Sequence, residues 1–341
     1  RDLYFPEFDD PETNDGVAEG MDFERSGGGY ATIRYGALSF SGLAISREKA
    51  VPTGPWETLF NAEQTTIDRQ WFVDSRYERD LGARGHFLLR GYMNGYTYDG
   101  VYPYEDQYTE TDRNESRWQG VETQLRWDLS EANRLTVGSE FTDHSQAWYF
   151  YEGDGEVYFD DDFPFTLFSA FVQDEVHLGR NWTVTVGGRY DRHSDVESSF
   201  TPRAAVLFHP TDHLNLKGLY GEGFRAPNRY ESHYDDGWAI ANPDVGPERV
   251  RTVEVVAEQR FSDRLHAAAY IFNYRVTDLI DQVEIDGGEF YQFQNAGTVE
   301  ANGVEVELTY RGFKGLSGYV SHVYQAVEWE RGGTLSNSPE N

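Results

Sequence analysis

The feature that most constrains the fold is an alternation of apolar and polar residues with a period of two. The segment 182–191, WTVTVGGRYD, carries Trp, Val and Tyr on one face and Thr, Arg and Asp on the other. The segments 116–128 and 303–310 repeat the pattern. Successive side chains of a β-strand point to opposite faces, so these segments predict strands with one apolar and one strongly polar face.

The connections between these segments alternate in length. Short ones lie near residues 36–37, 81–84, 130–133, 178–181, 210–213, 262–264 and 312–315, and long ones lie near 48–67, 99–115, 145–163, 192–200, 223–249, 281–290 and 329–341. In a ladder of hairpins, this order places every long loop at the same end. We expect about fourteen strands of roughly 9–14 residues and a single domain over residues 1–341.

Two architectures fit an alternating ladder. A soluble sandwich or propeller would use its apolar face as a core, but its strands are usually about 5–6 residues long. A transmembrane barrel has longer strands, short turns at one end, long loops at the other and aromatic girdles. We therefore predict an all-β, transmembrane, antiparallel up-and-down β-barrel. Aromatic residues near the strand ends suit interfacial belts: Trp127, Trp148, Tyr149, Trp182, Tyr190 and Tyr220.

Composition and motifs exclude several functions. The net charge of -30 argues against a nucleic-acid partner, which needs clustered Lys and Arg. The chain has no Cys, and hence no disulfide or thiolate metal site. It contains no His-Glu-x-x-His, Gly-x-Ser-x-Gly or P-loop motif, so we expect no enzyme.

Several segments occur in the order found in one family. They are YGEGFRAPNRYE (220–231), NPDVGPE (242–248), FNYRVTDLID (272–281), YQFQNAGTVEANGVEVEL (291–308) and, in part, GGTLSNSPEN (332–341). This series resembles the C-terminal half of the barrel of TonB-dependent outer-membrane receptors. LAISREKAVPTG (43–54), FVQDEVHL (171–178) and VGGRYD (186–191) are similar to other parts of that barrel. The chain departs from the family where Asp244-Val245-Gly246 replaces Asp-Leu-Lys, and at Glu340.

The resemblance implies active import of a scarce nutrient across the outer membrane of a Gram-negative bacterium, most simply a ferric siderophore or a similar metal chelate. Such barrels have about 22 strands around a plugged lumen, so we expect a partial wall. The plug, its TonB-contacting box and the closing strands are expected elsewhere in a longer precursor, and TonB is expected to act through that plug. The alternatives are a passive porin and a soluble, acidic, β-rich binding module.

The resemblance also places the long loops outside the cell, and it implies outer-membrane lipid and lipopolysaccharide as partners. It assigns to the outer loop that follows Phe224 the residues Arg225, Pro227, Asn242, Pro243 and Glu248. Because Pro removes a ladder donor, Pro227 ends the strand, and the motif also fits a structural turn without ligand contact.

Two further clusters are candidate sites. Aromatic faces suit planar or cationic ligands, and aromatic side chains gather in YDGVYPYEDQY (98–108) and around residue 150. The candidates are Tyr102, Tyr104, Tyr108, Trp148, Tyr149 and Tyr151.

Carboxylates gather in YEGDGEVYFDDDF (151–163), where five side chains could supply Ca²⁺ with oxygen ligands: Asp154, Glu156, Asp160, Asp161 and Asp162. The spacing does not match an EF-hand, and a solvated acidic loop is the alternative. We expect no other cofactor. A mouth rich in carboxylates disfavours anionic cargo unless Arg113 and Arg117 offset it.

Overall fold

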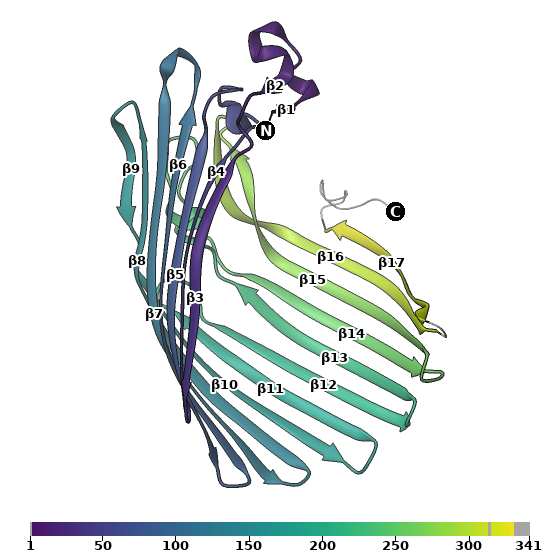
Figure 1. Cartoon of the computed structure of the whole chain (residues 1–341). Coiled ribbons are helices and arrows are strands. Elements are labelled where there is room, and N and C mark those ends of the chain that lie inside the picture. The colour runs from purple at the N-terminus through teal and green to yellow at the C-terminus, as the bar shows by residue number, and fades with distance from the viewer. Residues whose placement is uncertain (1, 313–314, 331–341) are drawn as a thin grey trace.

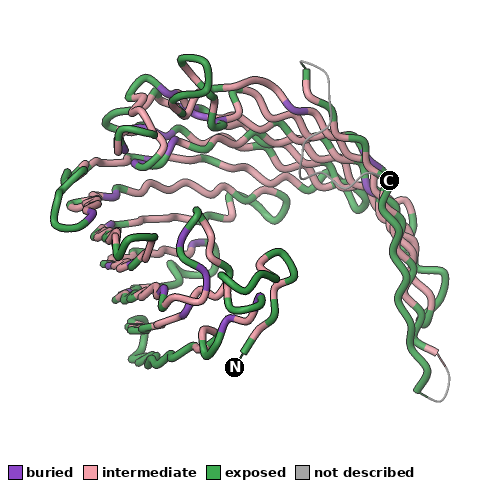
Figure 2. Tube along the Cα trace, turned by 90° about the horizontal axis from the view of Figure 1, so that it is seen from above, coloured by how far each residue is buried: buried purple, intermediate pink, exposed green. Residues whose placement is uncertain are grey.

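The computed structural model describes residues 2–312 and 315–330. It is one long antiparallel sheet that curls into an open trough (Figure 1). Fourteen strands follow one another in the ladder, from β3 at one edge to β17 at the other, and β9 pairs beside β8. The expected strand number and the all-β barrel class are thus confirmed. Seen from above, the strands follow an open arc (Figure 2). The segment 332–341 lies outside the described residues.

The first part of the chain runs through β1 (Leu3–Tyr4), η1 (Pro6–Phe8), η2 (Pro11–Gly16), β2 (Val17–Ala18), β3 (Glu24–Tyr35), β4 (Leu38–Ala50), η3 (Pro55–Glu57), β5 (Thr65–Leu81), β6 (Gly85–Pro103), η4 (Glu105–Gln107), β7 (Thr109–Ser130), β8 (Asn133–Gly153) and β9 (Glu156–Asp162). The second part comprises β10 (Phe165–Leu178), β11 (Trp182–His193), β12 (Ser199–Thr211), β13 (Leu214–Arg225), α1 (Arg229–His233), β14 (Glu248–Arg260), β15 (Leu265–Ile285), β16 (Phe290–Arg311) and β17 (Ser317–Trp329). No described helix is long and apolar enough to cross a bilayer.

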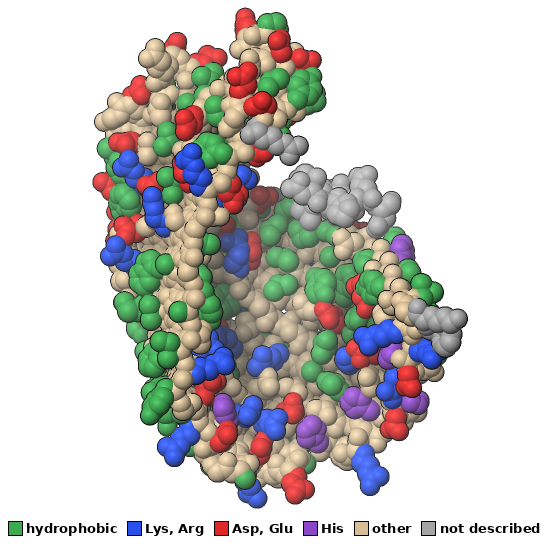
Figure 3. Space-filling view, in the orientation of Figure 1, with side chains coloured by type: hydrophobic (Ala, Val, Ile, Leu, Met, Phe, Trp, Pro, Cys, Tyr) green, Lys and Arg blue, Asp and Glu red, His purple; other side chains and the backbone are tan. Residues whose placement is uncertain are grey.

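The two faces of the sheet differ as the alternation predicts. Outward side chains are apolar and exposed, for example Val121 at 55% and Ile271 at 61%. On the outer edge at the left of Figure 3, hydrophobic side chains form a band with charged groups above and below it. An apolar band of this kind is typical of a lipid-facing barrel surface.

Inward side chains form ion pairs both across strands and within a strand. Arg90 of β6 contacts Asp74 of β5 at 2.5 Å and Glu122 of β7 at 3.4 Å. Arg189 of β11 contacts Asp191 at 2.9 Å, and Asp191 accepts a hydrogen bond of 2.6 Å from Ser169. Such pairing satisfies charges that would otherwise be buried alone.

Asp174 shares the outward face with apolar residues such as Val172 and Val186. Its carboxylate accepts hydrogen bonds of 2.9 and 3.0 Å from the side-chain amide of Asn133, the first residue of β8. Asn133 adjoins a short turn, so Asp174 lies toward that end of the ladder and away from its middle.

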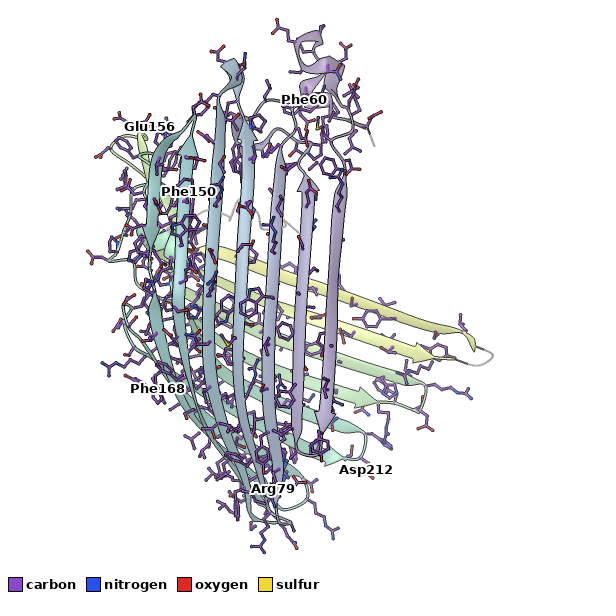
Figure 4. All side chains as sticks on the ribbon, turned by 60° about the vertical axis from the view of Figure 1, so that its left-hand side comes forward. Phe60, Arg79, Phe150, Glu156, Phe168 and Asp212 are labelled. Atoms are coloured by element: carbon purple, nitrogen blue, oxygen red, sulfur yellow. The ribbon has the colours of Figure 1, made fainter. Side chains whose placement is uncertain are left out.

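Several expected long loops are wrong, because the strands continue through them. β7 and β16 each have 22 residues, and β6 and β7 leave only residues 104–108 between them. The acidic segment is likewise a hairpin of β8 and β9. In Figure 4, Glu156 and Phe150 mark this extended end, and Arg79 and Asp212 mark the end with the short turns. Beyond an apolar band both strand faces can be polar, so carboxylates there do not interrupt a ladder.

Candidate ligand-binding site

A cavity of about 700 Å³ opens at the extended end of the ladder. Fourteen residues line it: Trp56, Tyr96, Tyr98, Tyr102, Tyr104, Glu110, Asp112, Asn114, Ser116, Tyr149, Tyr151, Tyr230, Tyr234 and Asp236. The wall comes from β6, β7 and β8, and the connection between β13 and β14 closes one side. Its volume lies in the range of small-molecule sites, which is about 300–1,000 Å³.

Strand parity decides which side chains reach the cavity. Even-numbered residues of β6 and β7 face inward, so Tyr102 and Asp112 line it. In β8 the register shifts at Ser145, because Trp118 pairs with His144 whereas Arg117 pairs with Gln146. This β-bulge reverses the parity beyond it, so Tyr149 and Tyr151 face the cavity.

The tyrosine hydroxyls form a network with carboxylates. Tyr98 and Tyr102 share a hydrogen bond of 2.5 Å, and Tyr96 donates one of 2.5 Å to Asp68. Burial, together with a hydrogen bond to Glu110, raises the pKa of both Tyr104 and Tyr151, so both hydroxyls stay protonated. They therefore act as donors to Glu110.

Asp112 is the most perturbed acid in this wall. Burial raises the pKa of Asp112 to about 6 and outweighs the hydrogen bond from Asn114, whose amide donates at 3.2 Å. The outward neighbours at this height, Asp99 and Arg113, are charged, so Asp112 lies beyond the apolar band. At neutral pH it is a carboxylate that pays a desolvation penalty.

The β13–β14 connection is clamped to the rim by two arginines. Arg225 contacts Glu231 at 2.7 Å and Glu248 at 2.8 Å. Arg229 is buried, pairs with Asp195 and donates a hydrogen bond of 3.1 Å to the carbonyl of Phe163. These contacts hold Tyr230 and Tyr234 against the barrel wall, where Tyr234 meets Tyr149 edge-on at 6.5 Å.

A family model described as "TonB dependent receptor-like, beta-barrel" matches residues 10–341. The chain belongs to this family. The "Hemin receptor" of Yersinia pestis is 33% identical over 123 residues, which cover 29% of this chain and 18% of that protein. The "Iron-regulated outer membrane virulence protein" of Vibrio cholerae is 29% identical over 124 residues, which cover 35% of this chain and 19% of that protein. The chain therefore spans less than a third of the length of these relatives.

Solved structures share the fold at low identity. The ferric enterobactin receptor of Pseudomonas aeruginosa superposes with a TM-score of 0.70 at 18% identity, over 89% of this chain and 51% of that chain. The FrpB iron transporter of Neisseria meningitidis gives 0.68 at 16% identity, over 90% and 52%. The resemblance inferred from the motifs is thus confirmed. A TonB-dependent receptor barrel places the chain in the outer membrane, and the family consists of receptors, in keeping with the expectation of no enzyme.

In this TonB-dependent receptor, the family-motif residues act mainly as structural contacts. Glu248 binds Arg225 and also accepts a hydrogen bond of 2.8 Å from the backbone of Ile280. Asn242 donates to the carbonyl of Phe293 at 2.8 Å, and a turn from Asn242 to Val245 encloses Pro243. Pro227 lines a smaller cavity of about 220 Å³ next to the tyrosine cavity. The motif fixes the position of the loop.

The predicted aromatic residues separate into two groups. Tyr102, Tyr104, Tyr149 and Tyr151 meet in the cavity. Tyr108 and Trp148 do not line it: Tyr108 bonds to Tyr158 at 3.2 Å, and Trp148 donates to Asp160 at 2.8 Å. Tyr149, which we assigned to an interfacial belt as well, faces inward, so that assignment is wrong. The bulge at Ser145 explains why, beyond it, the odd-numbered residues of β8 face inward.

The carboxylates of the β8–β9 hairpin stabilise the hairpin instead of converging. Asp162 accepts from the backbone of Ala147 at 2.7 Å, and Asp154 from that of Thr109 at 3.2 Å. The Asp161 carboxylate accepts a hydrogen bond of 3.0 Å from the backbone amide of Asp162, and Glu156 is the first residue of β9. Within residues 2–312 and 315–330, no group of three His, Asp or Glu side chains could hold a metal ion. A Ca²⁺ ion in this hairpin stays a prediction that no geometry here supports.

Sequence reasoning named four of the fourteen lining residues as candidates and missed the other ten. Tyr230, Tyr234 and Asp236 arrive from the β13–β14 connection, and Trp56 from the β4–β5 connection. The composition of residues 220–250, rich in Tyr, Asp and Asn, could have indicated a binding loop, but it does not show which strands the loop packs against. A stack of Trp118, His144, Phe165 and His193 beneath Arg229 was also unforeseen.

Proposed function

We propose that this chain forms the ligand-receiving wall of an outer-membrane receptor that captures an iron-containing chelate, with import driven by TonB through a plug domain. The observation that carries the proposal is the tyrosine cavity at the end of the barrel with the long connections. Those connections face the cell exterior in this proposal, and the outer surface of the ladder next to them borders lipopolysaccharide.

The names of the relatives support iron as the cargo. They are a hemin receptor and an iron-regulated outer-membrane protein, and the structural neighbours include a ferric enterobactin receptor and an iron transporter. A passive channel is the second candidate, because the inward polar residues line a wide trough. A soluble binding module is not supported, since the outward face exposes large apolar side chains along many strands.

The test uses the full-length receptor that contains this chain, in its own host. Deletion of the gene should abolish growth on one class of ferric chelate under iron limitation, and deletion of TonB should have the same effect. Uptake that persists without TonB would support a passive channel and contradict the proposal.

A variant pair tests the cavity itself. Tyr102→Ala with Tyr104→Ala should weaken binding of the imported chelate about tenfold or more, because each removes aromatic contact area. The matched control, Tyr108→Ala with Tyr158→Ala, removes two tyrosines at the same end that do not line the cavity. Both variants should assemble as heat-modifiable barrels. Equal affinity of the two variants for the chelate would show that the cavity is not the binding site.

A further inference from the structure

The cavity wall is unusual in what it lacks. Eight tyrosines, three carboxylates, one amide, one hydroxyl and one indole line it, and none of the described lining residues is Lys or Arg. Anionic chelates are normally held by guanidinium or ammonium groups. This wall offers them none.

The nearest arginines do not compensate. Arg113 lies on the outward face, 3.8 Å from Asp99, with its guanidinium over Phe150. Arg117 also faces outward and pairs with Glu115 at 2.5 Å. Strand parity therefore removes both residues that we expected to offset the carboxylates.

The arginines of the β13–β14 connection are also occupied. Arg225 is shared between Glu231 and Glu248, and Arg229 between Asp195 and the carbonyl of Phe163. Arg229 lines the adjoining smaller cavity instead of the tyrosine cavity. Among the described residues that line the tyrosine cavity, the charged ones are therefore Glu110, Asp112 and Asp236.

The hydrogen-bonding groups of the wall are mainly acceptors. The hydroxyl groups of Tyr96, Tyr104 and Tyr151 already donate to carboxylates. A fourth hydroxyl proton is used in the hydrogen bond between Tyr98 and Tyr102. The lone pairs of these oxygens remain. A ligand that fills the cavity would meet acceptors on most sides.

One atom gives independent support. The side-chain oxygen of Asn114 is buried in this wall and has no hydrogen-bond partner, while its amide nitrogen donates to Asp112. A buried acceptor without a partner costs about 1–3 kcal/mol, and a donor on a bound ligand would relieve that cost. Asn114 and Asp112 are thus neighbouring acceptors, joined by the hydrogen bond of 3.2 Å between their side chains.

Building on the proposed function, we infer that the cavity selects ferric chelates of zero or positive net charge that present amide N–H or ammonium groups to Asn114 and Asp112. Anionic ferric complexes are disfavoured by the three carboxylates. Tyrosine faces add cation–π attraction for an ammonium group.

The experiment measures binding to the purified full-length receptor with four probes of different charge. They are a ferric trihydroxamate with an ammonium tail, its uncharged N-acetyl derivative, a ferric tris-catecholate anion and hemin. We expect the first two to bind at least about tenfold more tightly than the anionic pair. Tighter binding of the catecholate or of hemin would overturn the inference while leaving iron-chelate import intact.

A substitution connects the preference to Asp112. Asp112→Asn keeps the shape and removes the charge, so it should weaken the cationic probe roughly tenfold and the uncharged probe by less than about threefold. Glu105→Gln is the matched control, since it removes one carboxylate from the neighbouring hairpin turn, outside the cavity wall. Equal losses for both probes, or equal effects of the two variants, would refute the role of Asp112. Failure of every probe to bind, together with failure of iron uptake, would instead refute the proposed function.

Discussion

Arg225 provides the sharpest test of how the β13–β14 connection is held. Its guanidinium makes four hydrogen bonds of 2.7–3.0 Å to Glu231 and Glu248, whose side chains are each 13% exposed. Arg225→Met removes the cation and leaves two nearly buried carboxylates facing each other. The carboxylates retain backbone partners at Asn228 and Ile280, so the barrel should still assemble.

The magnitude follows from the burial of the partners. Removing one member of a buried ion pair costs about 3–5 kcal/mol, and the 44% exposure of the Arg225 side chain reduces this to about 2–3 kcal/mol. If that energy stabilises the closed loop, the opening constant of the loop should rise roughly 30- to 150-fold.

The rate of amide hydrogen exchange of residues 229–234 in the full-length receptor measures this opening of the loop. The amides of Ser232 and Tyr234 are bonded within α1 at 3.2 and 3.3 Å, so their exchange reports release of the helix. Arg249→Met is the matched control, because its contact with Glu197 is 3.8 Å long and exposed and should contribute less than about 1 kcal/mol. A rise of less than threefold in the Arg225 variant, or the same rise in both, would refute the clamp.

Three more outcomes are expected. Burial raises the pKa of Asp112 to about 6, so this carboxyl is charged above that pH. Binding of a cationic chelate, measured by titration, should therefore weaken as the pH falls from 7.5 to 5. The Asp112→Asn variant should lose this pH dependence. Gly138→Ala should lower the unfolding midpoint, at a cost of about 1–3 kcal/mol, because its Cβ would approach the Phe171 ring at 2.4 Å and a backbone oxygen at 2.8 Å; Gly221→Ala, with nothing within 4 Å, should not. Deletion of Ser145 should leave an assembled barrel that still binds the chelate, because residues from Gln146 onward keep their partners on β7 and Tyr149 and Tyr151 still face inward; lost affinity would show that the bulge itself shapes the cavity.

The alternation of the sequence predicted the faces of the sheet well. The polar faces of 116–128 and 182–191 carry Glu122, Arg189 and Asp191, and all three take part in inward ion pairs. This success has a simple cause, because side-chain direction in a strand depends only on parity and on which face is apolar. Asp174 departs from this rule, because it lies on the apolar face, and the hydrogen bonds that it accepts from Asn133 pair its carboxylate there.

The lengths of the strands were not predictable in the same way. An apolar band specifies only the part of a strand that faces lipid. Above it, the ladder of β6 and β7 continues through Tyr98 paired with Asn114, where neither face needs to be apolar. Polar composition at this level therefore indicated a loop where the backbone forms a hairpin.

The cavity depends on two features that a period-two pattern cannot contain. The first is one unpaired residue, Ser145, which reverses the parity of β8 and turns Tyr149 and Tyr151 inward. The second is the folding back of the β13–β14 connection, fixed by Arg225 and by the buried Arg229. Because the bulge supplies one wall and the clamped loop the other, changes in either should alter ligand choice without changing the barrel. Loops of this kind can vary in sequence while the strands keep their alternation, which separates cargo recognition from the requirement to span the membrane.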